Sequence, residues 1–193
     1  MSNRNIPKKI VFALLLLLVV YSFTVPKFSD HLKFVSSQDT TMSPLAMYGE
    51  YLYNDEKCNS CHTLVTDEYS GAINLDGLGG KYSDMWHFYH LQDPPTMVPN
   101  SGMPPFPYLT SNPMDKGLFN QIVSAKLSTI TQNDLELLWQ KMNAEEDTML
   151  VGLQANKVPA RKNTEILAVI AYLQQIPASP AKAKKDALKK DSL

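Results

Sequence analysis

The chain has 193 residues, 44% of them hydrophobic, and its 18 basic and 19 acidic residues leave a formal net charge of -1 at pH 7. This near-neutral balance gives no indication of a nucleic-acid partner. Once the N-terminal segment is set aside, the length suits one domain with a modest hydrophobic core.

Residues 1–28 predict an N-terminal membrane anchor. Positions 10–25 form an uncharged apolar run, somewhat shorter than the roughly 20 residues of a typical transmembrane helix. Basic residues precede this run, so the positive-inside rule places the N-terminus in the cytoplasm and residue 29 onward in the periplasm. A cleaved signal peptide is the alternative, but residues 24–26, Thr-Val-Pro, make a poor cleavage site. We therefore expect a single-pass protein of the inner membrane.

A polar linker at positions 29–42 leads into a domain expected over residues 43–177. Ser43 and Pro44 form an N-cap followed by proline at the first helical position. The helix predicted over residues 45–55 delivers the chain to its most informative motif.

Residues 58–62 read C-N-S-C-H, the C-x-x-C-H pattern at which c-type haem is attached. Two cysteines at this spacing reach the two vinyl groups on one edge of the porphyrin, and the adjacent histidine is brought against the iron as an axial ligand. The pattern predicts thioether bonds from Cys58 and Cys61 and iron ligation by His62. The chain contains two cysteines in all, so one covalent haem uses both thiols.

Two other uses of paired cysteines have less support. A redox C-x-x-C motif is typical of a thioredoxin-like setting of strands and helices, which the sequence around Cys58 lacks. A structural zinc site needs a second pair of ligands. His87 and His90 have suitable chemistry, but their order and spacing fit no common zinc module.

Three segments follow the motif. Residues 63–80 are expected to form a loop, residues 82–92 a short helix capped by Ser83, and residues 93–113 a proline-rich, non-helical loop. No segment alternates convincingly between polar and apolar residues as a half-buried strand would.

Three more helix starts are predicted downstream. Residues 112–113, Asn-Pro, repeat the cap-and-proline signature, and Thr131 with Asp134 resembles a capping box. The last strong helix is capped by the residue at position 163 or 164 and ends at Pro177.

A six-coordinate electron-transfer haem needs a second axial ligand opposite His62. Met103 is the favoured candidate, because Gly102 and the prolines that follow make a stiff loop that can hold a sulfur against the iron. A thioether ligand also stabilises the reduced iron and raises its potential. His87 and His90 share one helical face; bis-histidine ligation stays open as the alternative, and hydrogen bonds to propionates, backbone or a neighbouring subunit are the use we favour for them. The other side chains considered are Met85, Met97 and Met114.

Two aromatic residues beside these histidines are expected to bind the cofactor. Tyr82 carries an O–H donor and Trp86 an N–H donor, and both could reach the haem propionates.

Residues 79–91 read G-G-K-Y-S-D-M-W-H-F-Y-H-L, and residues 98–104 read V-P-N-S-G-M-P. These runs resemble the mono-haem subunit (subunit II) of cbb3-type cytochrome c oxidases, which has G-G-[RK]-Y-S-D-x-W-H-x-x-H-L followed by V-P-x-S-x-M-P. The resemblance covers most of the chain but is specific only over residues 79–108. Residues 168–173, A-V-I-A-Y-L, extend it with a pattern that class I cytochromes c share.

One departure from the family lies in the turn after C-x-x-C-H. The family usually has a long insertion and then a G-P-D-L turn, whereas residues 71–75 read G-A-I-N-L and lack the proline. In class I cytochromes c a backbone carbonyl of this turn accepts the Nδ1–H of the axial histidine. Ala72 or Ile73 is expected to supply that carbonyl here.

The resemblance implies an electron-relay function. One haem c would receive single electrons from a donor cytochrome c and pass them to the catalytic haem–copper subunit of a cbb3-type terminal oxidase, with the other oxidase subunits as partners, and the chain alone would be no enzyme. The alternatives are the cytochrome c subunit of a nitric oxide reductase and a free-standing membrane-tethered electron carrier. A haem-based sensor or peroxidase with an open iron site is a third, which ligation by Met103 would exclude.

The predicted fold class is all-α, with an N-terminal transmembrane helix plus a class I cytochrome c domain. Within that domain the first and last helices are expected to cross, with Tyr172 packed near Gly49 and Tyr53. Residues 178–193 form a Lys- and Ala-rich tail with the composition of a disordered segment.

Overall fold

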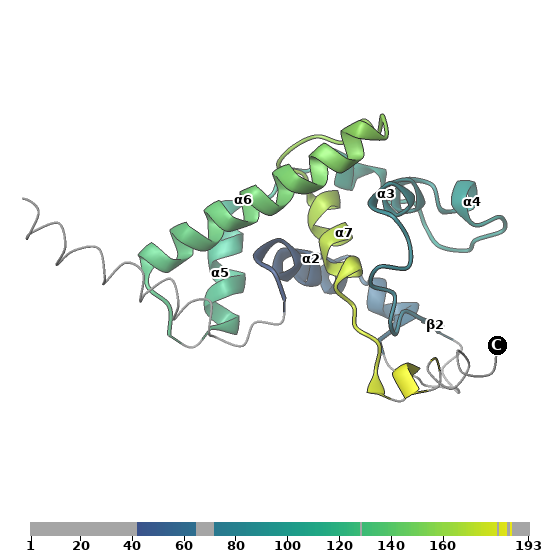
Figure 1. Cartoon of the computed structure of the whole chain (residues 1–193), viewed down its shortest axis with the longest axis horizontal. Helices are drawn as coiled ribbons and strands as arrows, with labels where there is room; N and C mark the ends of the chain where they lie inside the picture. Colours follow the sequence, from purple (N-terminus) through teal and green to yellow (C-terminus); the bar gives the residue numbers. More distant parts are fainter. Residues whose placement is uncertain (1–41, 65–71, 128, 181, 185, 187–193) are drawn as a thin grey trace, which may run out of the picture. The chain divides into compact units, whose positions relative to one another are not determined.

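The computed structural model describes residues 42–64, 72–127, 129–180, 182–184 and 186, all of which belong to one compact unit, Met42–Leu193. The elements in chain order are the helix α2 (Pro44–Asp55), the 3-10 helix η1 (Cys58–Ser60), the strands β1 (His62–Thr63) and β2 (Ile73–Asn74), the helices α3 (Asp84–Gln92) and α4 (Pro94–Met97), the 3-10 helix η2 (Pro107–Thr110), and the helices α5 (Lys116–Lys126), α6 (Gln132–Ala155) and α7 (Glu165–Gln174). The domain is thus mainly helical, as predicted, but it also contains a pair of short strands (Figure 1).

Three helices begin where their capping residues predict. The Ser43 hydroxyl accepts a hydrogen bond from the Ala46 backbone N–H at the start of α2, and Ser83 caps α3 in the same way. Thr131 and Asp134 form the complete capping box of α6, each side chain accepting from the other residue's backbone N–H. These short polar side chains satisfy backbone donors that the first helical turn leaves unpaired.

The start of α5 differs from the prediction. It begins at Lys116 after an Asp115 cap, three residues beyond the expected proline. Pro113 instead forms an antiparallel bridge with Thr164, and the Glu165 N–H donates to a carbonyl of the same segment, 3.0 Å away. Pairing with the chain before α7 thus holds this stretch extended, so the local cap-and-proline signal does not start a helix there.

A small sheet lies where only loop was predicted. β1 and β2 run parallel, with His62 opposite Ile73 and Thr63 opposite Asn74. Each strand has two residues, too few for an alternating pattern to be visible in the sequence. The proline-rich segment 93–113 also contains two short helices, α4 and η2.

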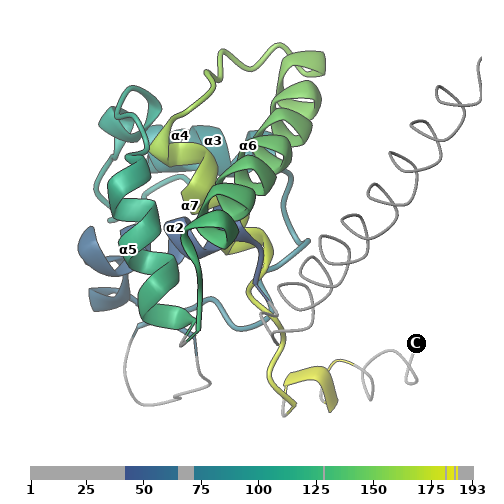
Figure 2. The same cartoon turned by 90° about the vertical axis from the view of Figure 1, so that its left-hand side faces the viewer.

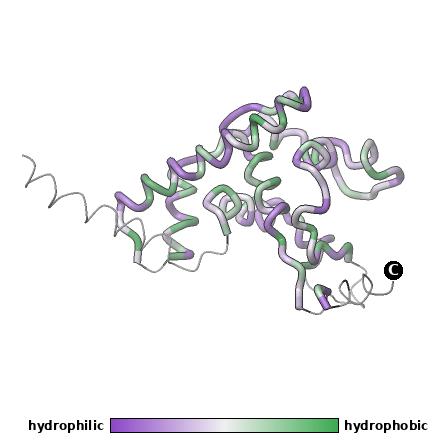
Figure 3. The backbone as a smooth tube through the Cα atoms, in the orientation of Figure 1, coloured by the Kyte–Doolittle hydropathy of each residue, from purple (hydrophilic) through white to green (hydrophobic). Residues whose placement is uncertain are grey.

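The centre of the domain is the crossing of α2 and α7, as predicted. A Cβ built on Gly49 would lie 1.9 Å from the Ala168 carbonyl oxygen, so only glycine allows the two backbones to approach this closely. Beside it the rings of Tyr53 and Tyr172 lie 5.2 Å apart. Residues 166–173 of α7 are all buried, as expected of a helix that is apolar on every side, and Figure 3 shows this helix as a hydrophobic segment in the interior.

The long helix α6 lies across this crossing, and α5 packs beside it (Figures 1 and 2). The contact includes an edge-on pair of rings, Phe119 and Trp139, with centroids 5.3 Å apart. These helices cover one side of the crossing, while α3 packs against α7 elsewhere.

The transmembrane part of the predicted fold class needs a correction. Among the residues that the structure describes, no helix is both long and apolar enough to cross a membrane. The anchor was predicted at residues 1–28, which lie outside the described residues. The structure therefore supports a helical domain and gives no support to the transmembrane helix.

Candidate functional site

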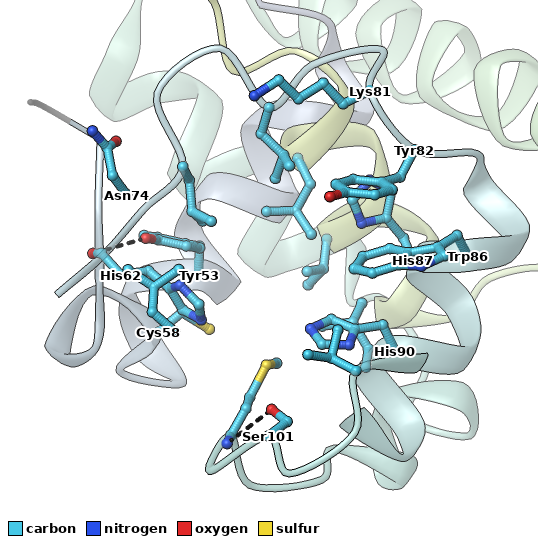
Figure 4. Close-up of a pocket in the computed structure, with 18 residues that line it drawn as sticks. Tyr53, Cys58, His62, Asn74, Lys81, Tyr82, Trp86, His87, His90 and Ser101 are labelled. Atoms are coloured by element: carbon cyan, nitrogen blue, oxygen red, sulfur yellow. Dashed lines mark hydrogen bonds between the residues drawn. The ribbon is translucent and has the colours of Figure 1, made fainter. Parts of the chain in front are cut away.

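A pocket of about 280 Å³ opens beside the α2–α7 crossing. This volume is far larger than a water site needs and approaches that of small-molecule sites. Figure 4 shows Cys58 and His62 on one side and Tyr82, Trp86 and His90 on the other. The full lining comprises Tyr53, Cys58, His62, Ile73, Asn74, Leu75, Leu78, Lys81, Tyr82, Trp86, His87, His90, Leu91, Val98, Ser101, Met103, Val169 and Leu173.

Cys58 lies at the start of η1, directly after Lys57, whose φ of 59° places it in the left-handed region. Burial raises the pKa of the Cys58 thiol to about 11, so the sulfur is protonated at neutral pH. Redox-active C-x-x-C motifs have a lowered thiol pKa, and the thioredoxin-like alternative therefore loses support. Cys61 is exposed and does not line the pocket.

His62 is held by its backbone. The Tyr53 hydroxyl donates to the His62 carbonyl at 3.2 Å, and the parallel pairing with Ile73 fixes the strand. Burial lowers the pKa of the imidazole, and the Ile73 backbone opposes this effect. Nδ1 is buried without a hydrogen-bond partner among the described residues. The Ile73 backbone thus lies at the ring and favours its protonated form, as expected of a carbonyl that accepts from the imidazole.

Met103 reaches the same pocket from the loop after α4. Its backbone N–H donates to the Ser101 hydroxyl at 3.3 Å, and the Ser101 N–H donates to the Val98 carbonyl at 3.0 Å. The Phe106 N–H then donates to the Leu91 carbonyl at 2.8 Å and ties the loop to α3. These bonds add to the stiffness that the sequence indicates through Gly102 and the prolines.

Three rings stack along α3 and its cap. Tyr82 and Trp86 lie 4.1 Å apart at 18°, and Trp86 and His90 lie 4.5 Å apart at 23°. Residues four apart share one face of a helix, so the column runs from Tyr82, which is 44% exposed, to His90 in the pocket.

His87 and His90 both present an unpartnered nitrogen. Nε2 of His87 and Nδ1 of His90 are buried without a hydrogen-bond partner among the described residues. Burial lowers the pKa of His87 to about 4, with a further contribution from His90. Burial also lowers the pKa of His90, and His62 lowers it further. Both imidazoles are therefore neutral at pH 7.

The donor set fits a haem iron. Imidazole, thiol and thioether groups converge on one pocket, and these are the ligands and attachment groups that protein-bound haem uses. Buried nitrogens without partners are rare in finished structures, so their gathering here indicates a missing polar or metallic partner. Within the described ranges no group of three His, Cys, Asp or Glu side chains is arranged to hold a bare metal ion.

Several lining residues were not predicted. Tyr53 had been given a packing role only, and Asn74, Lys81 and Ser101 had no assigned role. Lys81 and Ser101 fall within the two specific sequence runs, so their place in those runs was the available signal. Asn74 comes from β2, which the sequence did not reveal.

A comparison with protein families finds one match, to the family described as "Cytochrome C oxidase, mono-heme subunit/FixO", over residues 71–179. The match spans α3, the Met103 loop and α7 and begins after the C-x-x-C-H segment at residues 58–62. No curated protein matches the chain significantly.

Proposed function

Because the chain belongs to the family of mono-heme cytochrome c oxidase subunits described as FixO, we propose that it relays single electrons through one covalent haem c to the catalytic haem–copper subunit of a cbb3-type terminal oxidase. Members of this family are electron-transfer subunits of an oxidase complex, so one haem and partner oxidase subunits follow from membership. Membership also removes support from the nitric oxide reductase and free-standing carrier alternatives.

One observation carries the proposal. Cys58 and His62 belong to one motif, and Met103 follows His62 by 41 residues (103 − 62). All three nevertheless line one pocket. In the proposed site Cys58 and Cys61 would hold the porphyrin by thioethers, and His62 and Met103 would ligate its iron. Bound haem c supplies an iron that alternates between the ferric and ferrous states.

The remaining residues of the pocket set the environment of the iron. The apolar side chains exclude water and keep the dielectric low, which is one of the protein's means of tuning the potential; they include Leu75, Leu78, Leu91, Val169 and Leu173. Tyr82 and Trp86 are proposed to donate their O–H and N–H to the propionates. Their mutual stacking fixes the directions in which these donors point.

Haem attachment also bears on location. Covalent attachment of c-type haem in bacteria takes place on the periplasmic side, and we propose that the haem domain faces that compartment. A reporter that is active only in the periplasm, fused after Leu193, should be active. If that reporter were inactive, and a reporter that is active only in the cytoplasm were active at the same fusion point, this location would be contradicted.

Covalent attachment can be tested directly. The full chain, produced with a c-type haem maturation system, should retain haem peroxidase staining on a denaturing gel. Replacing both cysteines, Cys58→Ala with Cys61→Ala, should abolish the stained band, because both thioether bonds are lost. Asn59→Ala is the matched control, since its side chain is exposed and bonds only Asn54; it should keep the band. Haem that acid-acetone extracts from the wild-type chain would contradict the proposal.

A further inference from the structure

His90 is a ring in the pocket that the proposed electron relay does not use. It lies in the last turn of α3, and its ring stacks on Trp86, which in turn stacks on Tyr82. Offset stacking of this kind restricts the orientation of each ring. The imidazole is therefore held in a defined position at the wall rather than free to turn into solvent.

The unpartnered nitrogen of His90 needs a partner. Nδ1 is buried without a full hydrogen bond among the described residues, although the Pro94 backbone acts on the ring, and a buried polar group that is left unsatisfied is destabilising. The pocket that it lines also contains His62 and Met103, the two proposed axial ligands.

His87, the other histidine of α3, is placed differently. Its ring meets Tyr82 and Trp86 edge-on, at interplanar angles of 86° and 88°, and only 1% of the residue is exposed. His90 instead lies face to face with Trp86 at the end of the stacked column, and Figure 4 shows it on the side of the pocket toward Ser101, in the loop that carries Met103. Of the two histidines, His90 is thus the one placed beside the Met103 loop.

We propose that His90 is a reserve axial ligand, whose imidazole binds the haem iron when the Met103 sulfur is lost from the distal position. The inference rests on the proposed function, because it requires a haem held by Cys58, Cys61 and His62. In the exchange an iron–sulfur bond breaks and an iron–nitrogen bond forms, with no change in electron count. The consequence is that loss of the thioether leaves the iron six-coordinate and still closed to oxygen.

The test uses the purified, haem-loaded full chain and its ferric absorption and electron paramagnetic resonance spectra. The wild type should show the near-infrared band of thioether–iron(III) ligation. Met103→Ala should lose that band and remain low-spin, with the signature of two imidazole ligands. Met103→Ala with His90→Phe should become high-spin, because phenylalanine keeps the stack on Trp86 but has no ligating nitrogen.

Two controls separate His90 from its neighbours. Met103→Ala with His87→Phe should stay low-spin, since His87 is not the reserve ligand. Added imidazole should return the Met103→Ala, His90→Phe chain to the low-spin state, which shows that this variant is folded with an open iron position. His90→Phe alone should keep the thioether band, because Met103 is still present.

The outcomes distinguish the two proposals. A covalently loaded Met103→Ala chain that is already high-spin would overturn the reserve role alone. A double variant with His90→Phe that stays low-spin without imidazole would do the same. A wild-type chain with two imidazole ligands would overturn both the Met103 assignment and the reserve role, and a wild type without covalent haem would overturn the proposed function and this inference with it.

Discussion

Glu146 is a fully buried carboxyl in the middle of α6. The Asn163 backbone N–H donates to its Oε1, while Oε2 has no hydrogen-bond partner among the described residues. Burial raises the pKa of this carboxyl, and the Asn163 N–H and the Lys162 ammonium oppose the shift without cancelling it. The carboxyl therefore holds its proton to higher pH in the folded chain than in the unfolded one.

This shift predicts a pH dependence of stability. A raised folded-state pKa contributes stability that is complete below the unfolded value of 4.5 and is lost as pH rises through the folded value. Glu146→Gln keeps an acceptor for the Asn163 N–H and cannot ionise. As pH rises above 4.5, the free energy of unfolding of this variant should therefore fall less than that of the wild type. Glu146→Ala removes the acceptor and should cost about 1–3 kcal/mol.

Urea unfolding of the haem-loaded chain at a series of pH values measures both effects. Asp147→Asn is the matched control, because the neighbouring Asp147 is exposed and its ion pair with Lys162 lies at the surface; the pH profile should change little. If the free energy of unfolding had the same slope against pH in the wild type and in Glu146→Gln, Glu146 would not be the group that causes the pH dependence.

The crossing of α2 and α7 depends on a single glycine. Gly49→Ala would place a methyl group 1.9 Å from the Ala168 carbonyl oxygen and 2.8 Å from the Tyr172 Cβ, so the helices would have to separate. Over-packing of this kind costs typically about 1–3 kcal/mol, and more when backbone is involved. The thermal midpoint should therefore fall by several degrees.

Gly152 supplies the comparison for this substitution. It lies in α6 with no atom within 4 Å of a Cβ built on it, so Gly152→Ala should be neutral or stabilise the chain by up to about 1 kcal/mol, through helix propensity. If both alanines had the same effect on the midpoint, the close approach at Gly49 would not be the cause.

The segment after α7 is tied to the loop before α3. Asp76 is buried, and the Ser179 backbone N–H and hydroxyl both donate to its carboxylate at 2.6 Å. The Gly77 and Gly79 N–H groups donate to carbonyls of Pro177 and Ile176 at 3.0 Å. The same loop carries Leu75 and Leu78, which line the pocket, so the segment supports one wall of the site. The predicted disorder of residues 178–193 stays a prediction for the tail as a whole.

Asp76→Ala should release this segment. The Ser179 hydroxyl is the main cause of the lowered pKa of Asp76, followed by the Ser179 backbone N–H. A depressed folded-state pKa gives stability that is present above the unfolded value and is lost as pH falls through the folded one. The protection factors of the Gly77 and Gly79 amides, taken relative to the intrinsic exchange rate at each pH, should therefore fall in Asp76→Ala at pH 7 and fall in the wild type at low pH.

Ser111→Ala is the control for this exchange measurement, because the Ser111 hydroxyl donates to a carbonyl on an exposed turn far from the segment in sequence. It should leave the Gly77 and Gly79 amides unchanged. Unchanged exchange at those amides in Asp76→Ala would mean that the Ser179 contacts do not hold the loop.

Local signals predicted most of the helices. Ser43, Ser83 and the Thr131–Asp134 pair act within three residues of themselves, so the sequence alone reveals them. The predicted start of α5 was wrong because Pro113 pairs with Thr164, 51 residues further along the chain (164 − 113). The β1–β2 pairing was not predicted for the same reason, because it depends on a partner strand and not on a pattern within either strand.

The site was predictable in chemistry but not in arrangement. The C-x-x-C-H spacing and the Gly–Met–Pro setting identified Cys58, His62 and Met103, and the structure brings these three to one pocket. The stacking of Trp86 on His90 and the burial of His87 depend on how α3 packs against α7, so the sequence left the roles of both histidines open. Cys61 lies outside the pocket lining.

The molecule as a whole offers a face for partners beside the pocket. Ile73 is 63% exposed and lines the pocket. Leu64 is 40% exposed and directly follows β1, whose Thr63 pairs with Asn74 next to Ile73. Exposed apolar side chains gathered at one place mark interaction surfaces. Since the family consists of oxidase subunits, we expect this face to lie against another subunit of the complex.

Leu64→Asp should weaken that assembly, because a charge would be buried at the subunit contact. Co-purification of the other oxidase subunits should fall, while the haem spectrum of the chain stays unchanged, since Leu64 does not line the pocket. Val151→Asp is the matched control: Val151 is 69% exposed on α6, which contributes no pocket residue. Equal losses for the two variants would show that the pocket face has no special role.

The last prediction concerns what the chain does alone. If His62 and Met103 ligate the iron as proposed, with His90 in reserve, the iron has no open site at which oxygen could bind. A haem held in this way can still exchange electrons with a neighbour through its edge. The purified, haem-loaded chain supplied with a reductant should therefore not reduce oxygen at a catalytic rate, measured with an oxygen electrode. Deleting the chain from the complex should stop electron entry from a donor cytochrome, while the catalytic haems and copper, where assembled, remain reducible by dithionite. Substantial oxygen consumption by the isolated chain would contradict the relay function and favour an enzyme with an open iron site.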